Sequence, residues 1–381
     1  MLFYDILLSL LPLMRSIIYI VLAVCLALLA ATQHNAPKLD TTSGATAIHA
    51  EYVAKPIIKS DTVRIVFGGD LMQHMPQVEA ARTADGTYDY SESFAYVAPM
   101  FRNADIAILN LETTITTSGY YTGYPCFASP TAIADEIADM GIDLALLANN
   151  HCCDRNAKGI DTTIEELNRR AIKHIGVYKD SLDRAQNNIA YITARNIRFA
   201  VVNYTYGTNG IPIPRGRYVN LIDTVAIKSD LATICRDSVD MVIACMHWGN
   251  EYERKPNREQ LRLGDMLRRE GVDIIIGSHP HVVQHFEADS THATFYSLGN
   301  LVSNQQRRHC DGGLIAEIEV IRCDTIDGLR LRATAHPVWV LCPGYRILPR
   351  HIGDTLTMTN DARRRYEIFM TDTEELLYGK E

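Results

Sequence analysis

The stretch that decides the fold is residues 241–251, Met-Val-Ile-Ala-Cys-Met-His-Trp-Gly-Asn-Glu, an apolar run that ends abruptly in polar residues. A short continuous apolar run bounded by polar or glycine residues is typical of a buried β-strand. Similar runs recur along the chain at 63–67, 106–109, 144–148, 199–202 and 274–276.

Longer amphipathic stretches separate these runs. Residues 131–140, 161–171 and 257–270 have apolar side chains at helical spacing, and a glycine follows the first and last of them directly. Alternation of short apolar runs with amphipathic helices predicts βαβ units and therefore an α/β fold. Toward the end, the segments 314–323 and 329–340 flank Asp327-Gly328, which predicts an antiparallel hairpin.

Composition indicates a folded protein. The chain has 381 residues, of which 47% are hydrophobic and 22% charged, with a formal net charge of -8. Since no run of lysines or arginines stands out, we expect no nucleic-acid partner. The nine cysteines follow no paired spacing, so we expect most to be free or buried rather than joined in disulfides.

The first 31 residues are almost wholly apolar apart from Asp5 and Arg15. We interpret residues 1–31 as a signal peptide. A retained signal anchor is the alternative, because the two apolar halves together can cross a bilayer. We therefore expect an exported protein that is membrane-anchored, periplasmic or at the cell surface. We expect a linker at 32–61, a folded domain at 62–350 and a C-terminal tail at 351–381.

Polar residues collect where the apolar runs end. In open α/β sheets the carboxyl ends of the strands line one crevice, so residues far apart in sequence are expected to meet there. Two carboxylates, amides and four histidines form a ligand set suited to Mn²⁺, Fe, Zn²⁺ or Mg²⁺. The residues that follow the runs include Asp70, Asn110, Glu112, Asn149, Asn150, His151, His247, Glu251, His279, His281, Ser297 and Asn300.

His279-Pro280-His281 is the sharpest local signal in this set. Residues i and i+2 of an extended segment project to the same side, and a proline favours extended geometry in the residue before it. We therefore expect both imidazoles to reach neighbouring metals. Taken alone, such a tripeptide is more often a pair of loop histidines bonded to backbone or water.

The other candidates also have ordinary structural interpretations. Asp70 follows two glycines and could serve only as a turn or helix cap, and His247 alone would more often be a core histidine. Glu112 is different, because a buried carboxylate needs a metal or an arginine partner. Asn150 and His151 precede the predicted helix at 161–171 by too many residues to cap it directly.

These motifs together resemble the poly-gamma-glutamate capsule synthesis (CapA) family over about residues 63–304. The matching pieces are Gly69-Asp70, Asn110-Leu111-Glu112, residues 147–151 with Asp154 and Gly159, residues 247–249 with Glu251-Tyr252, residues 277–282 with Gln284, and residues 296–300. That family is similar in fold to calcineurin-like metallophosphoesterases, which are β sandwiches flanked by helices that hold two metals.

The resemblance implies roles for individual residues. Glu112 would bridge the two metals, and His151 would be either the catalytic histidine or a histidine that supports the metal ligands. Asn110, Asn149, Asp154, Glu251, Ser297 and Asn300 would lie beside the metals or the substrate. Asp70 and His281 would be further ligands of one metal. Asn150, His247 and His279 would be further ligands of the other. The first strand end departs from the phosphoesterase pattern, since Asp70 is followed by Leu71-Met72 and His74 lies two residues beyond the expected position. One of the two metals therefore lacks a ligand, and a single occupied site is an alternative.

The implied function is synthesis or export of a poly-gamma-glutamate-type capsule polymer, with one or two divalent metal ions and a candidate hydrolase activity on phosphoester or amide linkages. The expected ligand is an anionic polymer or a phosphoester, and the expected partners are membrane-bound capsule synthesis proteins. Two alternatives stay open, a non-catalytic polymer-binding partner of an export complex and a general secreted phosphoesterase.

Overall fold

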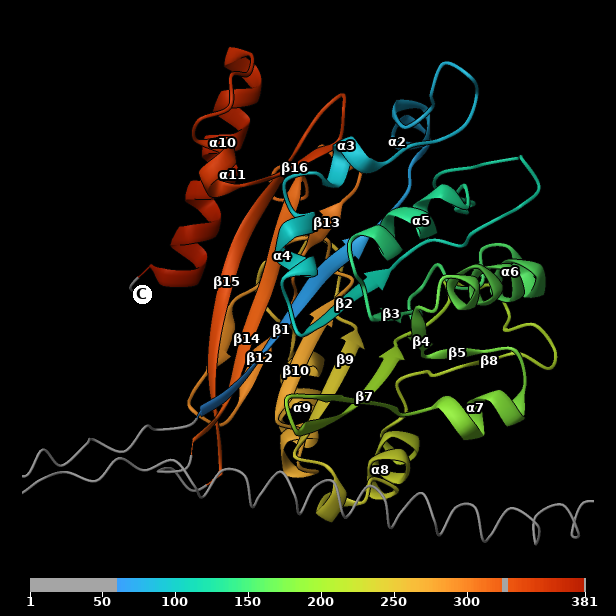
Figure 1. Ribbon diagram of the computed structural model, residues 1–381, viewed down its shortest axis with the longest axis vertical. Helices are drawn as coiled ribbons and strands as arrows, with labels where there is room; N and C mark the ends of the chain where they lie inside the picture. The colour runs from blue at the N-terminus through green and yellow to red at the C-terminus, as the bar shows by residue number, and fades with distance from the viewer. Residues whose placement is uncertain (1–59, 324–327, 380–381) are drawn as a thin grey trace, which may run out of the picture. The chain divides into compact units, whose positions relative to one another are not determined.

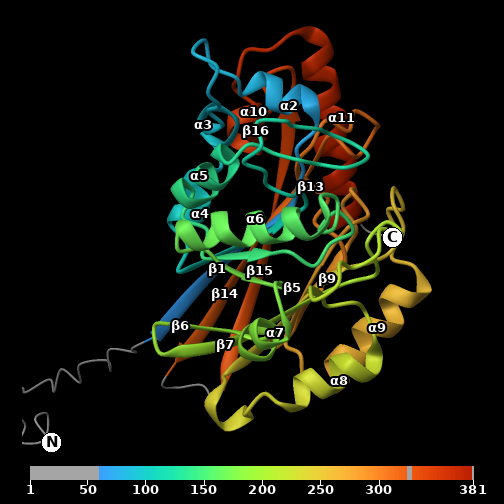
Figure 2. The same cartoon turned by 90° about the vertical axis from the view of Figure 1, so that its right-hand side faces the viewer.

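A computed structural model describes residues 60–323 and 328–379. Two β-sheets pack face to face and helices cover their outer faces (Figures 1 and 2). The predicted α/β sandwich flanked by helices is confirmed. The expected signal segment at 1–31 and nearly all of the expected linker at 32–61 lie outside the described residues. Within those residues, no helix combines the length and the apolar character needed to span a bilayer.

The first sheet has eight strands and is mixed. Strands β1 to β4 run parallel, whereas β14, β15 and β16 pair antiparallel, and β13 (Asn300–Val302) pairs with β1. Its main order is β16 (Arg346–Pro349), β15 (Leu329–Leu341), β14 (Gly312–Cys323), β1 (Ser60–Leu71), β2 (Ile106–Leu111), β3 (Leu144–Leu146) and β4 (Lys173–Ile175). The predicted antiparallel pairing of β14 with β15 is confirmed, although most of its turn lies outside the described ranges.

The second sheet has six strands with a parallel centre. Its order is β11 (Phe286–Ala288), β12 (Ala293–Phe295), β10 (Ile274–Ser278), β9 (Met241–His247), β7 (Ile197–Thr205) and β6 (Ala190–Ala194). A small two-stranded sheet joins β5 (Val177–Tyr178) to β8 (Tyr218–Val219).

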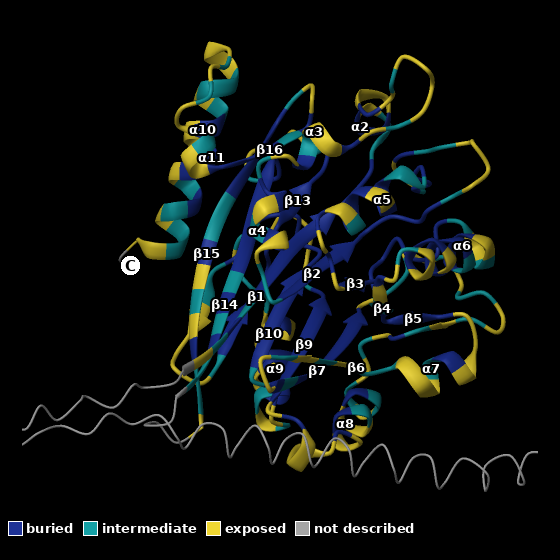
Figure 3. Ribbon diagram, viewed as in Figure 1, coloured by how far each residue is buried: buried dark blue, intermediate teal, exposed yellow. Residues whose placement is uncertain are grey.

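The hydrophobic core lies in three layers. Side chains from the inner faces of both sheets form the central layer, for example Ile65, Ile108, Ile243 and Ile276. A second layer lies between the first sheet and α3 (Ser91–Phe94), α4 (Ala98–Arg102), α5 (Ala132–Asp139) and α6 (Asn156–Arg169). A third lies between the second sheet and α8 (Thr224–Ala232) and α9 (Arg258–Arg269). Figure 3 shows the consequence, with buried strands inside and exposed residues on helices and loops.

Five further helices complete the described residues. They are α2 (Met75–Ala80), α7 (Ser181–Asn187), a short 3-10 helix (Arg236–Ser238), α10 (Arg350–Gly353) and α11 (Asn360–Tyr378). The sequence predicts a tail at 351–381, but α11 packs along β15 (Figure 1). Its Tyr366, Phe369 and Met370 are buried in the central core. Their spacing puts them on one helix face, which explains the packing.

The helix predicted at 161–171 also differs, because α6 begins five residues earlier, at Asn156. Gly159 weakens the helical signal there. The glycine is required by packing, since an added Cβ would lie 2.4 Å from the Arg155 side chain and 3.3 Å from that of Thr114.

Candidate metal centre

Strand register brings the polar residues together. In the first sheet Asp70 is paired with Asn110, and Asn110 with Leu146. In the second sheet Thr205 is paired with His247, and His247 with Ser278. Because these strands are parallel within each sheet, their carboxyl ends lie level, and the residues that follow them share one edge of the sandwich.

One half of the centre is formed by Asp70, Glu112 and His281. Their ligand atoms all lie within 4.8 Å of one another. The Asp70 Oδ2 atom is 3.0 Å from His281 Nδ1, and Glu112 Oε1 is 3.7 Å from His281 Nε2. The Asn110 amide donates to Asp70 Oδ1 at 2.8 Å and so fixes the orientation of that carboxylate.

The other half is formed by Asn150, His247 and His279. The Asn150 Oδ1 atom is 2.8 Å from His247 Nε2, which in turn is 3.8 Å from Glu112 Oε1. The ring centroids of His247 and His279 are 4.9 Å apart. Glu112 therefore lies between the two halves, in reach of His247 and His281.

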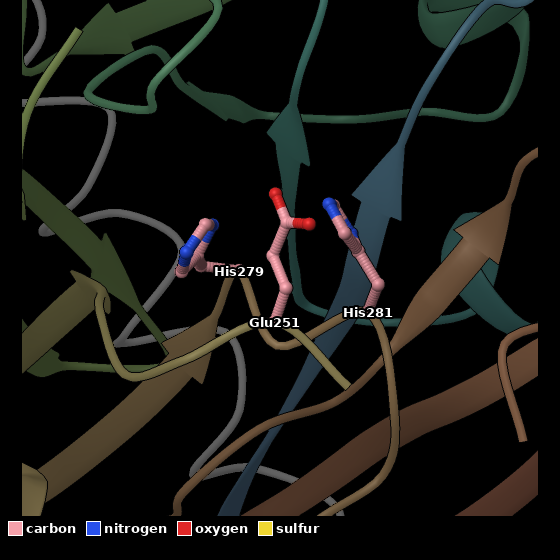
Figure 4. A group of neighbouring side chains, drawn as sticks. All are labelled: Glu251, His279 and His281. Atoms are coloured by element: carbon pink, nitrogen blue, oxygen red, sulfur yellow. The ribbon is translucent and has the colours of Figure 1, made fainter. Parts of the chain in front are cut away.

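Glu251 adds an exposed carboxylate beside the histidine pair His279 and His281. It lies on the loop after β9, and its ligand atom lies within 4.8 Å of those of His279 and His281. Figure 4 shows the Glu251 side chain between the two imidazoles, with the β-strands behind.

The extended geometry predicted for 279–281 is wrong. His279 has φ +96° and His281 φ +55°, and neither value belongs to an extended L-residue. Hydrogen bonds hold this turn in place, because the His279 N–H donates to Asp70 Oδ2 at 3.3 Å and the Tyr252 N–H donates to the Pro280 carbonyl at 2.8 Å. The ring centroids of His279 and His281 are 5.8 Å apart. The two imidazoles therefore converge through a tight turn rather than through strand alternation.

The electrostatics of the cluster fit a cation. Glu112 is fully buried, and its Oε1 atom has no hydrogen-bond partner; neither has His279 Nδ1. Burial, followed by the negative charge of Asp70, raises the pKa of Glu112. Burial lowers the pKa of His247 and lowers that of His279 to about 3. These imidazoles are therefore neutral at pH 7, as metal ligation requires.

No lysine or arginine of the described region forms an ion pair with Asp70 or Glu112. Two buried carboxylates without a cation are costly. The oxygen and nitrogen donors around them match the preferences of divalent first-row metals and Mg²⁺. The residues present thus fit a divalent metal ion.

His151 is held by Asp154. The His151 Nδ1 atom is 2.8 Å from Asp154 Oδ2, which also accepts from the Phe127 N–H at 2.6 Å. With Nδ1 protonated toward Asp154, His151 Nε2 is an acceptor, and Asn209 Nδ2 lies 3.4 Å from it. The Phe127 and His151 rings pack edge to face, with their centroids 4.6 Å apart.

The other predicted polar residues support the cluster to different degrees. The Asn149 amide donates to the Leu111 carbonyl at 2.8 Å, and Asn300 Oδ1 is 3.1 Å from His281 Nδ1. The Ser297 hydroxyl donates to the Val282 carbonyl at 2.8 Å and accepts from the Gly299 N–H at 3.2 Å. Ser297 therefore shapes the neighbouring loop.

Sequence reasoning missed Tyr206 and Asn209, which follow β7. The Tyr206 ring lies 4.4 Å from that of His279, and Asn209 Oδ1 accepts from the Asn150 amide at 3.2 Å. Both residues come just after the recognised apolar run at 199–202 and its continuation to Thr205. Inspecting that strand end like the others would have found them.

His74, noted above as displaced from the phosphoesterase pattern, packs its ring against Phe127 at 5.1 Å. Its Nδ1 atom accepts from the Asn304 N–H at 3.3 Å. Phe127 also contacts His151, so His74 lies behind this phenylalanine rather than among the ligand groups that the described residues form.

Fold and site together define a two-sheet α/β protein with a buried centre of carboxylates, imidazoles and amides suited to divalent metal. The chain belongs to the family of bacterial capsule synthesis proteins PGA_cap, whose model matches residues 64–305. This confirms the resemblance to the capsule synthesis family seen in the motifs.

Two curated relatives come from bacilli. The chain is 28% identical over 254 residues to the PGA biosynthesis protein CapA of Bacillus subtilis, covering 64% of each protein. It is 26% identical over 259 residues to the capsule biosynthesis protein CapA of Bacillus anthracis, with 65% of this chain and 61% of the relative covered. The match thus spans less than two thirds of either relative's length.

A solved structure described as a putative 5'-nucleotidase from Staphylococcus aureus aligns with a TM-score of 0.48 and 16% identity, covering 81% of this chain and 58% of that one. The 5'-nucleotidase from Candida albicans aligns with a TM-score of 0.44 and 11% identity, covering 82% of this chain and 58% of the other.

The roles of the individual metal ligands and of His151 stay predictions.

Proposed function

We propose that the protein is an accessory of capsule polymer synthesis or export at the cell envelope and that its buried centre holds one or two divalent metal ions. The family and the names of the bacillus relatives support the polymer assignment. The observation that carries the metal assignment is the burial of Asp70 and Glu112 among neutral imidazoles, without a basic partner in the described chain.

The expected ligand is an anionic polymer of the poly-gamma-glutamate type. We assign Glu112 as the shared carboxylate, Asp70 and His281 as ligands on one side, and Asn150, His247 and His279 as ligands on the other. A bound divalent ion would supply concentrated positive charge for a carboxylate or phosphoryl oxygen. Tyr206 and Tyr252 flank the histidine pair, with ring centroids 4.4 Å from His279 and 6.4 Å from His281 respectively, and would orient the incoming chain.

A second candidate function is hydrolysis of an amide or phosphoester linkage, which the His151–Asp154 pair favours. Asp154 orients the imidazole so that Nε2 can accept a proton and return it to a leaving group. If His151 has no such role, the protein is a non-catalytic polymer-binding partner of membrane-bound capsule proteins. Turnover of simple phosphoesters without polymer binding would instead indicate a general secreted phosphoesterase.

The place of action is also a proposal. Residues 1–31 have the apolar character of a signal peptide or signal anchor. We therefore place the protein outside the cytoplasmic membrane, either anchored to it, in the periplasm or at the cell surface.

The full chain, purified in detergent and loaded with Mn²⁺, Zn²⁺ or Mg²⁺, allows these functions to be separated. We would measure bound metal by elemental analysis, binding of a γ-linked glutamate oligomer, and turnover of that oligomer and of an aryl phosphate. Wild type should hold one or two metals per chain and bind the oligomer. The matched control is His292→Ala, a partly exposed histidine of the loop before β12.

His151→Ala decides between the two roles. If the protein is a hydrolase, this variant should keep its metal and lose turnover by about 100-fold or more, the scale of general acid–base catalysis. If wild type and His151→Ala bind the oligomer equally and neither turns anything over, the chain is a binding partner. Absence of both metal and oligomer binding in wild type would refute the proposal.

A further inference from the structure

A loop at the end of the family match is held against the C-terminal helix by hydrogen bonds. Residues 303–311 follow β13, and Asp372 of α11 holds two of them. Its carboxylate accepts from Arg308 through two hydrogen bonds of 2.8 Å each, and its Oδ2 atom is 3.0 Å from His309 Nε2. The Asp372 carbonyl also accepts from Arg254 at 2.8 Å. Asp372 therefore connects both this loop and the segment after β9 to α11 through hydrogen bonds.

Arg307 is the basic residue of this loop that Asp372 does not engage. Its side chain is exposed, and its guanidinium carbon lies 4.3 Å from the ring centroid of Tyr252. Within residues 60–323 and 328–379, no carboxylate forms an ion pair with Arg307. A guanidinium stacked on an aromatic face keeps its N–H groups free for a carboxylate in the plane of the fork.

Tyr252 brings this cation to the edge of the candidate metal centre. Its N–H donates to the Pro280 carbonyl at 2.8 Å, and its ring centroid lies 6.4 Å from that of His281. The preceding residue, Glu251, directs its carboxylate between His279 and His281 (Figure 4). Glu251 is thus directed to the histidines, which leaves Arg307 for an outside anion.

We propose that Arg307, stacked on Tyr252, forms an anion subsite at the mouth of the centre that binds a side-chain carboxylate of an anionic polymer. Asp372 is a positioning residue, because it fastens the loop that carries Arg307. The inference rests on the proposed function and deepens it by naming a contact for the polymer. The family match ends at residue 305, so Arg307 and α11 lie outside the matched region.

The test measures affinity of the metal-loaded full chain for a γ-linked glutamate oligomer at low and at high salt. Arg307→Gln should weaken binding about fivefold at low salt, the upper end for an exposed ion pair. The difference should shrink near 1 M salt, where the screening length is about 3 Å. Arg307→Lys should recover part of the affinity, since it keeps the charge but loses the planar fork.

Two further variants complete the design. Arg262→Gln removes the same charge from an exposed arginine of α9 that pairs with Glu259, and it should bind like wild type. Asp372→Asn should weaken binding in the same direction as Arg307→Gln and make the loop more sensitive to protease.

The outcomes separate the inference from the function on which it rests. If wild type binds the oligomer and Arg307→Gln binds equally well at low salt, the subsite is refuted while the proposed function stands. Equal losses in Arg307→Gln and Arg262→Gln would also overturn it, because they would indicate only the net charge of the chain. No binding by wild type would overturn both proposals.

Discussion

Replacing Glu112 with glutamine should change the stability of the metal-free chain and its response to metal in opposite directions. Glu112 is fully buried, and its Oε1 atom has no hydrogen-bond partner among the described residues. Burial and Asp70 raise its pKa, which means that the surroundings resist the carboxylate form. Glutamine has nearly the same shape without the charge, and its amide can donate to Asp70.

The expected size of the effect follows from the cost of the buried carboxylate and from the stabilisation that bound metal gives. Relief of an unsatisfied buried polar group is worth about 1 to 3 kcal/mol, so metal-free Glu112→Gln should be more stable than wild type. Metal at 100 times its Kd stabilises the chain that binds it by about 2.7 kcal/mol. For 381 residues, an unfolding entropy of about 2.1 cal/mol/K per residue converts this to a rise in Tm of about 3 °C.

Thermal unfolding with EDTA and with excess Mn²⁺ or Zn²⁺ tests this reasoning. With EDTA the variant should melt above wild type, and with metal wild type should gain about 3 °C while the variant gains less than about 1 °C. Glu165→Gln, the same change at an exposed position of α6, should behave like wild type in both conditions. The reasoning is refuted if Glu112→Gln lowers the Tm in EDTA or keeps the full response to metal.

Three further changes test the packing of the fold. Gly277→Ala should cost about 3 kcal/mol in urea unfolding, because an added Cβ would collide with the Tyr296 carbonyl and lie 2.6 Å from Trp248 Nε1; a cost below about 1 kcal/mol would contradict this packing. Phe369→Ala should cost about 3 to 5 kcal/mol because its ring is buried in the core, and an unchanged midpoint would contradict that packing. Burial, followed by Asp139 and Asp89, raises the pKa of Glu136 to about 7 from an ordinary value near 4.5. The stability of wild type should therefore fall as pH rises through that interval, and Glu136→Gln should flatten the fall in unfolding measured from pH 4 to 8.

Much of the architecture could be predicted because burial imposes a local pattern. The continuous apolar runs at 241–245 and 274–276 are the cores of β9 and β10, since strands covered on both faces need apolar residues at nearly every position. The run at 63–67 in β1 is interrupted by Arg64, which is partly exposed and pairs with Glu317. The α11 helix was missed because its buried residues are few and spaced within a charged segment.

The sequence by itself determined which side chains follow the strand ends and which family the motifs resemble, because both depend on residues close together in the chain. Only the tertiary structure decided how those side chains meet. The level ends of parallel strands, a turn with positive φ at His279 and His281, and hydrogen bonds from distant loops set the distances around Glu112. Such distances arise from contacts between residues 40 to 211 positions apart in the chain, and no local pattern encodes them.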